Sequence, residues 1–290
     1  MTSSSFADRP GSIWMDGELG PWSDAQLHVL NHGLHYGSGI FEGMRAYGGR
    51  IFKIHEHIQR FHESARLLGY ALPFDTDQIV AASRAVIAAN GQPDSYLRPV
   101  AWRGSEQMSV AAPKSRIHVA IACWPMPAYF SPTAGRAGIA LTLSNWRRQA
   151  PTMAPLQAKA AGLYMTGTLA KHEAMANGFD DALMLDWQGN IAEATAANIF
   201  LVIDGALHTP VADAFLNGIT RQTVISLAQD RGLEVVERRI APREIASASE
   251  AFVTGTAVEI APVSRIDDVA FTARSVTDDL MCAFMDAVRA

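Results

Sequence analysis

The sequence predicts an α+β protein made of two domains with a cleft between them. Helix and strand patterns alternate along both halves of the 290 residues. Hairpin patterns recur among them, which favours a mixed sheet over a purely parallel one. A stretch of turn formers and small residues, "FSPTAGRAG" at 130–138, interrupts the pattern near the middle. We therefore expect a small N-terminal domain over 1–130, a linker over 131–138 and a larger C-terminal domain over 139–290.

The first half combines a hairpin, two amphipathic helices and two apolar strands, separated by turn residues. These are the hairpin "SIWMDGELG", which turns at Asp16-Gly17, a helix over 54–68, a helix over 77–89 that stops at Asn90-Gly91, and strands in "SYLRPVAW" and "RIHVAIACW". The second half repeats the alternation. Its elements are a strand in "GIALTLSNW", a helix over 161–177, a strand in "DALMLDW", the hairpin "NIFLVIDGALHTP", a helix in "GITRQTVISLAQD", strands in "LEVVERRI" and "AFVTGTA", and a C-terminal helix over 276–288.

Composition excludes several classes of function. At 49% hydrophobic residues the chain buries a sizeable core, and its net charge of −5 shows no basic cluster for nucleic acid. No apolar run reaches the ~18 residues of a membrane span, and the N-terminus lacks an apolar signal core. The histidine spacing matches no metal motif. Cys123 and Cys282 lie in apolar stretches, so we expect free, buried thiols and a cytoplasmic protein.

A single charge, Lys159, stands in the small and apolar stretch "APLQAKAAGLYMTG" at 154–167. The 24 basic residues include only four lysines, which leaves 20 arginines. Lysine forms a Schiff base with an aldehyde and arginine does not, so a lysine at such a position is a candidate nucleophile. The alternative is a lysine whose stem lies along a helix while its ammonium reaches water.

Four further features are candidates for contacts to a phosphorylated ring. Gly218, Ile219 and Thr220 stand where a loop enters a helix, and free N–H groups there favour a phosphate, although an ordinary capped helix has the same pattern. "VTGTAVE" at 253–259 offers similar donors, or is a plain strand end. Glu193 is the one acid of a neutral stretch, a pattern that suits a protonated ring nitrogen but also a carboxylate that only caps a turn. Arg60 points off its helix's apolar face, so a solvated arginine is its simplest interpretation. Together these residues predict pyridoxal 5′-phosphate.

The stretch 193–221 resembles the signature of the class IV pyridoxal-phosphate aminotransferases (fold type IV), and within them the branched-chain amino acid aminotransferases. The positions that agree are Glu193, Thr195, Asn198-Ile199-Phe200, Leu207, Thr209, Leu216, Gly218-Ile219 and Arg221. The similarity runs from "IWMDGEL" to "EIAPVSRID", nearly the whole chain. It implies a cofactor cleft between the two domains, at least a homodimer, and amino transfer between branched-chain L-amino acids (Leu, Ile, Val) and 2-oxoglutarate.

The resemblance also implies roles for individual residues. Lys159 is similar to the lysine that bonds the cofactor and moves the proton, and Glu193 to the acid on the pyridine nitrogen. The other cofactor contacts that it implies are Arg60, Gly218, Ile219, Thr220 and Thr256 at the phosphate and Tyr164 at the phenolic oxygen. The implied substrate contacts are Tyr36, Phe41, Gly43, Tyr96, Arg98, Met108, Val110, Tyr129, Thr256 and Ala257. Among these, Tyr96 and the Thr256-Ala257 backbone receive the α-carboxylate and Arg98 recognises carboxylates. Part of the apolar wall (Tyr36, Met108, Val110 and Tyr129) comes from the neighbouring subunit.

Three positions depart from the family pattern. Leu163 replaces the usual asparagine after the lysine, Ala197 replaces an acid before the signature asparagine, and Met126 replaces an aromatic residue. These changes leave room for bulkier amino acids or amines. The rivals within the fold are D-amino acid or (R)-amine transaminases and aminodeoxychorismate lyase. "WRGSEQMSV" lacks the Arg-x-His pair of the D-amino acid enzymes, and "YLRP" favours the branched-chain type. A non-enzymatic binding protein would need Lys159 to be incidental.

Overall fold

The structure is a computed structural model that describes residues 5–126 and 138–290. The chain forms two compact units. The first holds the residues up to Met126 together with Ala158–Gly162, and the second holds the remaining described residues. The segment 158–162, predicted for the C-terminal domain, therefore belongs by its contacts to the first unit. The predicted boundary at 130 and nearly all of the linker 131–138 lie outside the described residues, so this part of the division stays a prediction.

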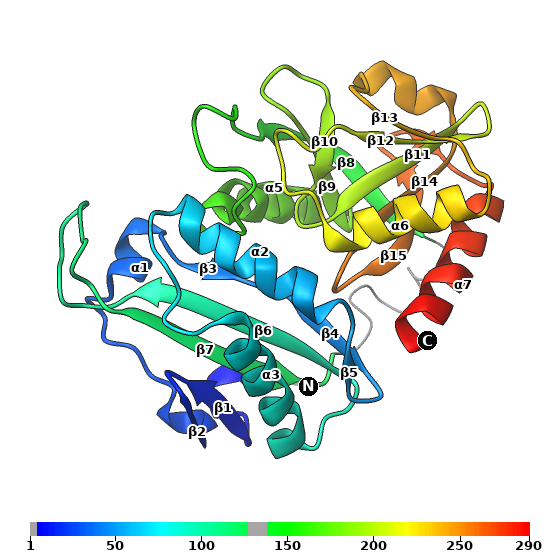
Figure 1. The fold of residues 1–290 in the computed structure, drawn as a ribbon. Helices are drawn as coiled ribbons and strands as arrows, with labels where there is room; N and C mark the ends of the chain where they lie inside the picture. Colours follow the sequence, from blue (N-terminus) through cyan, green and yellow to red (C-terminus); the bar gives the residue numbers. More distant parts are fainter. Residues whose placement is uncertain (1–4, 127–137) are drawn as a thin grey trace. The chain divides into compact units, whose positions relative to one another are not determined.

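The first unit is built on a seven-stranded antiparallel sheet in the order β2-β1-β7-β6-β4-β5, with β3 paired to β6. Helix α3 packs on β1, β6 and β7, and α2 packs on α3 and β3 (Figure 1). The bounds are η1 Phe6–Asp8, β1 Ser12–Met15, β2 Glu18–Pro21, η2 Trp22–Asp24, α1 His32–Tyr36, β3 Ile40–Phe41, β4 Met44–Tyr47, β5 Arg50–Ile51, α2 Ile54–Leu67, α3 Thr76–Asn90, β6 Ser95–Arg103 and β7 Ile117–Trp124.

Local chemistry explains where these elements begin and end. Met15 pairs with Glu18, so Asp16 and Gly17 form a two-residue turn, and both have positive φ. Helix α3 begins at a capping box, in which Asp75 accepts from the Gln78 backbone while the Gln78 side chain accepts from the Asp75 backbone. It ends at Gly91, which has φ 59°. The predicted hairpin and both predicted helices of this half are confirmed.

The second unit is built on a nine-stranded sheet in the order β10-β9-β8-β15-β14-β11-β12-β13, with β16 on β15. Strand β8 runs parallel to β9 and β15, and β12 parallel to β13, so the predicted mixed sheet is confirmed. Strand β10 also pairs with β11, which closes six strands into a ring. The bounds are β8 Ile139–Arg147, α5 Met165–Ala176, β9 Asp181–Leu185, β10 Ile191–Ala194, β11 Asn198–Ile203, β12 Ala206–Pro210, α6 Ile219–Asp230, β13 Val235–Arg238, η4 Pro242–Ser247, β14 Ala248–Gly255, β15 Glu259–Ile266, β16 Val269–Ala270 and α7 Ser275–Arg289. The 3₁₀ turn η3 Ala161–Tyr164 begins in the first unit and ends in the second.

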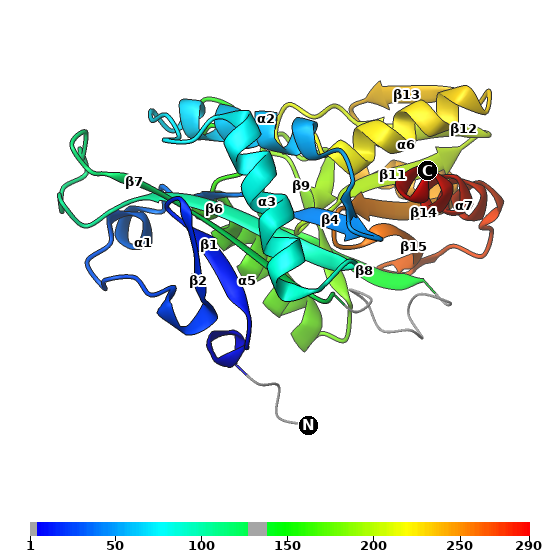
Figure 2. The same cartoon turned by 60° about the horizontal axis from the view of Figure 1, so that its bottom comes forward.

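The helices of the second unit cover its sheet. Helix α5 packs on β8 and β9, whereas α6 and α7 pack on each other and on β14 (Figure 2). The apolar core of this unit is contributed mainly by the strands, for example Leu141, Leu183, Ile199 and Val253. One predicted element differs, because the helix expected over 161–177 is divided into the 3₁₀ turn η3 and the α-helix α5.

The two cysteines occupy different environments. Cys123 on β7 is buried, as predicted, and burial raises the pKa of its thiol to about 11. Cys282 is exposed on α7, so the prediction of a buried thiol there is wrong. It lies on the outward side of an amphipathic helix whose inner side carries Leu280 and Phe284. None of the helices in the described ranges has the length and apolar character that crossing a membrane requires.

Candidate active site

Lys159 is held by its backbone in the first unit. Its N–H donates to Ser64 Oγ on α2 at 2.9 Å, and its carbonyl accepts from the Phe41 N–H at 3.0 Å. The side chain is half-buried, and Nζ lies 4.9 Å from the centroid of the Phe41 ring. The small neighbour Gly162 has a structural reason, because a Cβ there would lie 3.0 Å from the Gly37 carbonyl oxygen. The lysine is therefore fixed beside an aromatic ring.

Four of the predicted substrate residues are linked in a series of contacts: Phe41 with Arg98, Arg98 with Tyr96, and Tyr96 with Gly43. The Arg98 guanidinium carbon lies 4.7 Å from the Phe41 centroid, and its Nη2 donates to Tyr96 Oη at 3.1 Å. A Cβ on Gly43 would fall 2.1 Å from Tyr96 Oη, so glycine is required there. Arg98 Nε is buried and has no hydrogen-bond partner among the described residues. A buried donor of this kind suits an anionic ligand.

Arg60 belongs to a buried charge cluster with Glu42 and His57. Arg60 Nε and Nη2 donate to the two Glu42 carboxylate oxygens at 2.7 and 2.9 Å, and His57 Nδ1 lies 2.8 Å from Glu42 Oε2. The Arg60 side chain is only 15% exposed, so the interpretation as a solvated arginine is wrong. Burial alone would raise the pKa of Glu42, but Arg60 and His57 together outweigh it through charge and hydrogen bonds and hold that pKa well below its usual range.

Sequence reasoning missed Glu42 and His57, although it selected the residues on both sides of Glu42. Glu42 is fully buried, and burial lowers the pKa of His57, which favours the neutral imidazole. Because an ionised carboxylate only accepts hydrogen bonds, His57 Nδ1 then carries the hydrogen that faces Glu42. One signal was present in the sequence. Glu42 is a single acid among apolar and small residues in "GSGIFEGM", which is the same kind of signal that marked Lys159.

Glu193 lies on β10 in the second unit and is buried. Arg148 Nη2 lies 3.0 Å from Glu193 Oε1 and also donates to the Thr195 carbonyl at 2.9 Å. Asn198 Nδ2 donates to Glu193 Oε2 at 3.2 Å. These contacts favour an ionised carboxylate with a fixed orientation, which can hold a proton on a ring nitrogen. Arg148 was missed, because 45 residues separate it from Glu193 and only the sheet brings the two together.

Three of the predicted phosphate residues, Gly218, Ile219 and Thr220, stand at the start of α6. Gly218 is the N-cap residue of this helix and, as a glycine, has no side chain with which to cap its first turn. Ile219 and Thr220 follow and are buried. Thr254 pairs with Asn198 across β14 and β11, and its buried Oγ1 has no hydrogen-bond partner among the described residues. Thr256 and Ala257 lie in the turn that follows β14. A helix start with a glycine N-cap suits a phosphate, and the buried Thr254 hydroxyl is a further donor in the same unit.

The remaining predicted residues lie elsewhere. Tyr164 is half-buried at the end of η3 in the second unit. Tyr36, Met108 and Val110 belong to the first unit and are exposed by 42%, 42% and 84%. Tyr129 lies outside the described residues. Within 5–126 and 138–290, no group of three or more His, Cys, Asp or Glu side chains is arranged to hold a metal ion.

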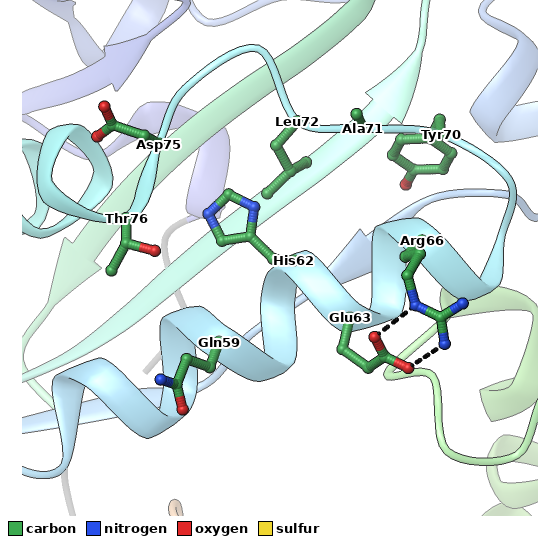
Figure 3. Close-up of a pocket in the computed structure, with 9 residues that line it drawn as sticks. All are labelled: Gln59, His62, Glu63, Arg66, Tyr70, Ala71, Leu72, Asp75 and Thr76. Atoms are coloured by element: carbon green, nitrogen blue, oxygen red, sulfur yellow. Dashed lines mark hydrogen bonds and ion pairs between the residues drawn. The ribbon is translucent and has the colours of Figure 1, made fainter.

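A groove beside α2 is a different feature. It has a volume of about 500 Å³ and lies between this helix and the segment that leads to α3 (Figure 3). Its lining residues are Gln59, His62, Glu63, Arg66, Tyr70, Ala71, Leu72, Asp75 and Thr76. None of them is a predicted cofactor or substrate residue, so the groove is separate from the candidate active site.

Comparison with known proteins identifies the family. A family profile described as Amino-transferase class IV matches residues 39–266. The branched-chain-amino-acid aminotransferase of Pseudomonas aeruginosa is 42% identical and covers 98% of this chain and 95% of its own. The Escherichia coli enzyme of the same name is 38% identical and covers 89% of this chain and 85% of its own.

Solved structures agree. The branched-chain amino acid aminotransferase of T.th. with pyridoxamine 5′-phosphate has a TM-score of 0.92 at 39% identity and covers 97% of this chain and 94% of its own. The Thermoproteus uzoniensis branched-chain aminotransferase with norvaline has a TM-score of 0.92 at 36% identity, with 97% and 95% covered. The chain belongs to the class IV aminotransferases. The aminotransferase has the mixed α/β fold of type IV.

The side chains of this aminotransferase fit the family's cofactor, pyridoxal 5′-phosphate. The first unit offers an amine beside an aromatic ring, at Lys159 and Phe41. The second unit offers a buried carboxylate at Glu193 and, separately, the helix start at Gly218 for an anion. An aldehyde, a ring nitrogen and a phosphate are the three groups that such a donor set recognises.

Proposed function

We propose that this enzyme transfers the amino group reversibly between branched-chain L-amino acids (Leu, Ile, Val) and 2-oxoglutarate. The observation that carries the proposal is the mixed character of the Lys159 surroundings. The Phe41 ring supplies an apolar face, and the buried Arg98 Nε supplies a donor for a carboxylate. Such a site accepts an aliphatic chain and also a second carboxylate such as that of glutamate. The enzyme is a branched-chain-amino-acid aminotransferase.

Two ligands of one solved relative support both halves of this assignment. The T.th. enzyme has been solved with N-(5′-phosphopyridoxyl)-L-glutamate, and also with 4-methylvaleric acid. The first ligand carries the glutamate skeleton, and the second carries a branched aliphatic chain with a carboxylate. This chain is 38% identical to that protein and offers an arginine and an aromatic ring for the same two tasks.

The cofactor's pyridine ring, once bound, withdraws electrons from the substrate Cα. In the first unit, we assign to Lys159 the bond to the cofactor and the transfer of the proton from and to the substrate carbon. Tyr96 Oη and Arg98 orient the carboxylates of the substrate, while Arg60 binds the phosphate. In the second unit, Glu193 holds a proton on the ring nitrogen, which Arg148 supports by keeping the carboxylate ionised.

The remaining predicted contacts of the second unit complete the assignment. Gly218, Ile219, Thr220 and Thr256 would hold the phosphate, Tyr164 would contact the phenolic oxygen, and the Thr256-Ala257 backbone would receive the α-carboxylate. The N-cap position of Gly218, which no side chain caps, supports the phosphate assignment. Thr254 Oγ1, a buried donor without a partner among the described residues, is an additional candidate beside them.

A half-reaction panel tests the substrate. The pyridoxal form of the enzyme is mixed with single amines, and conversion is followed by the cofactor's absorbance. We expect rapid conversion with L-leucine, L-isoleucine, L-valine and L-glutamate. Conversion of D-alanine or (R)-1-phenylethylamine at least as fast as L-leucine would contradict the proposal and favour the alternative transaminases. Cleavage of aminodeoxychorismate would favour the lyase.

Reduction with borohydride followed by peptide mapping tests the nucleophile. We expect a phosphopyridoxyl group on Lys159 alone. The structure makes two other lysines poor candidates, because Lys171 is paired with Asp181 at 3.1 Å and Lys53 lies 3.9 Å from Glu56. Label on Lys53, Lys114 or Lys171 would overturn the assignment.

We also propose that a second copy of the chain covers an apolar patch of the first unit. The patch consists of exposed side chains from two segments, at 27–36 and 108–110: Leu27, Val29, Leu30, Leu34, Tyr36, Met108 and Val110. The His32 ring joins the segments, because its Nε2 lies 3.0 Å from the Ser109 carbonyl oxygen. An apolar patch of this kind is typical of an interface.

Sedimentation of the wild type and of Leu34→Glu tests the patch. We expect a dimer or a higher homo-oligomer for the wild type, and dissociation with loss of activity for the variant. A wild-type monomer that is fully active would contradict the proposal.

We further propose a cytoplasmic location, which the free thiols of Cys123 and Cys282 support. Cell fractionation tests it.

A further inference from the structure

Asn198 lies between the two halves of the predicted cofactor site in the second unit. It is the first residue of β11 and is 5% exposed. Its register partner on β10 is Glu193, and its register partner on β14 is Thr254. The signature places an asparagine at this position without giving it a task. The contacts of Asn198 in the structure indicate what that task is.

The Asn198 amide nitrogen uses both of its hydrogens. One is donated to Glu193 Oε2 at 3.2 Å, and the other to the Leu216 carbonyl at 3.1 Å. Leu216 lies two residues before Gly218, the N-cap of α6. A single amide group therefore contacts both the acid assigned to the ring nitrogen and the loop assigned to the phosphate.

The other side of the same amide restricts the loop. A Cβ built on Gly218 would lie 2.2 Å from Asn198 Oδ1, which is far inside van der Waals contact. Gly218 has φ −63°, so its backbone angles do not require glycine. Glycine is needed at the N-cap because the Asn198 side chain occupies the space where a methyl group would stand.

We propose that Asn198 is a positioning residue that couples the ring-nitrogen end of the cofactor site to the phosphate end. It orients the Glu193 carboxylate through one hydrogen bond and fixes the start of α6 through the second bond and through contact with Gly218. The inference rests on the proposed roles of Glu193 and Gly218. It goes beyond them, because it assigns the alignment of these two binding groups to a third residue.

Binding of pyridoxamine 5′-phosphate to the cofactor-free full chain tests the coupling, because this ligand needs no bond to Lys159. We expect Asn198→Ala to lower the affinity about tenfold, the scale of one hydrogen bond to a charged group. Asn198→Asp should lower it at least as much. Its loss should deepen as pH rises, because the new carboxylate then repels Glu193 more strongly.

Asn190→Ala is the matched control. The Asn190 amide also donates to a buried carboxylate, that of Asp186 at 3.1 Å, but it lies in the turn between β9 and β10, and its side-chain hydrogen bonds within the described residues go to Asp186. Both substitutions remove one amide donor, and both lower the thermal midpoint. Only the Asn198 change should alter the affinity for pyridoxamine 5′-phosphate and its pH profile.

A double-mutant cycle with Gly218→Ala gives the decisive result. Alone, the added methyl group should displace Asn198 and lower the affinity about tenfold. In the Asn198→Ala background the methyl group meets no Oδ1, so it should cost little more. Additive losses, or wild-type affinity in Asn198→Ala, would overturn the coupling. A wild-type chain that binds no pyridoxamine 5′-phosphate would instead refute the proposed function.

Discussion

The buried Glu42 carboxylate makes a specific prediction about stability. It accepts four hydrogen bonds: from Arg60 Nε and Nη2, from His57 Nδ1, and from the Gly43 N–H at 3.2 Å. Glu42→Gln keeps the size of the side chain and removes its charge. Whichever way the new amide turns, its NH₂ group replaces an oxygen that accepted from a donor. If it replaces Oε2, three donors lose their acceptor; if it replaces Oε1, Arg60 Nε does.

The expected loss in free energy of unfolding is about 3–5 kcal/mol, the usual cost of removing one partner of a buried ion pair. The cost is large because Glu42 is fully buried, so water cannot replace the lost interactions. Glu63→Gln is a matched control on the helix that carries Arg60. Glu63 also binds an arginine through two hydrogen bonds, to Arg66 at 2.7 and 2.5 Å (Figure 3). Because that pair is exposed and water screens it, the control should unfold close to the wild type.

Urea unfolding of the cofactor-free enzyme, followed by far-UV circular dichroism, measures both variants. The pH dependence provides a second check. The folded pKa of Glu42 lies below its unfolded value of about 4.5, so its ionisation stabilises the fold fully above that value and progressively less below it. The difference in free energy of unfolding between wild type and Glu42→Gln should therefore have its full size at neutral pH and become smaller below about pH 4. Equal stability of Glu42→Gln and Glu63→Gln at neutral pH would refute the reasoning.

Three further outcomes are expected. Arg148→Met should remove the guanidinium that lies 3.0 Å from Glu193 Oε1 and lower kcat about tenfold or more; an unchanged kcat would contradict this. Glu250→Gln should destabilise by about 1–3 kcal/mol in thermal unfolding at neutral pH. Burial alone would raise the pKa of Glu250. The N–H and hydroxyl groups at the start of α7, including those of Thr277, outweigh burial and hold this pKa below its usual value. The difference in stability between wild type and Glu250→Gln should therefore shrink as pH falls below about 4. Lys159→Arg should have no measurable turnover although it keeps the positive charge, because arginine cannot form a Schiff base with the cofactor. Turnover in a coupled glutamate assay would contradict the assignment of Lys159 as the residue that bonds the cofactor.

Much of the fold follows from local sequence signals. The amphipathic period of 54–68 is enough to predict α2, and Asp16-Gly17 and Gly91 mark a turn and a helix end through the backbone angles they adopt. The candidate site was also found largely in this way. The spacing from Glu193 to Arg221 and the isolated charge of Lys159 are properties of short stretches, and they select residues that the structure places in fixed and partly buried positions.

Only the tertiary structure shows which residues support the candidate site residues. Arg148 reaches Glu193 because β8, β9 and β10 are neighbours in one sheet, and Glu42 meets Arg60 because α2 packs on β3. The segment 158–162 joins the first unit through hydrogen bonds to Phe41 and Ser64, more than 90 residues earlier. Local periodicity determines which face of an element is apolar, but it says nothing about the partner that face meets. Buried charges need such partners, and only the folded chain brings them within hydrogen-bond distance.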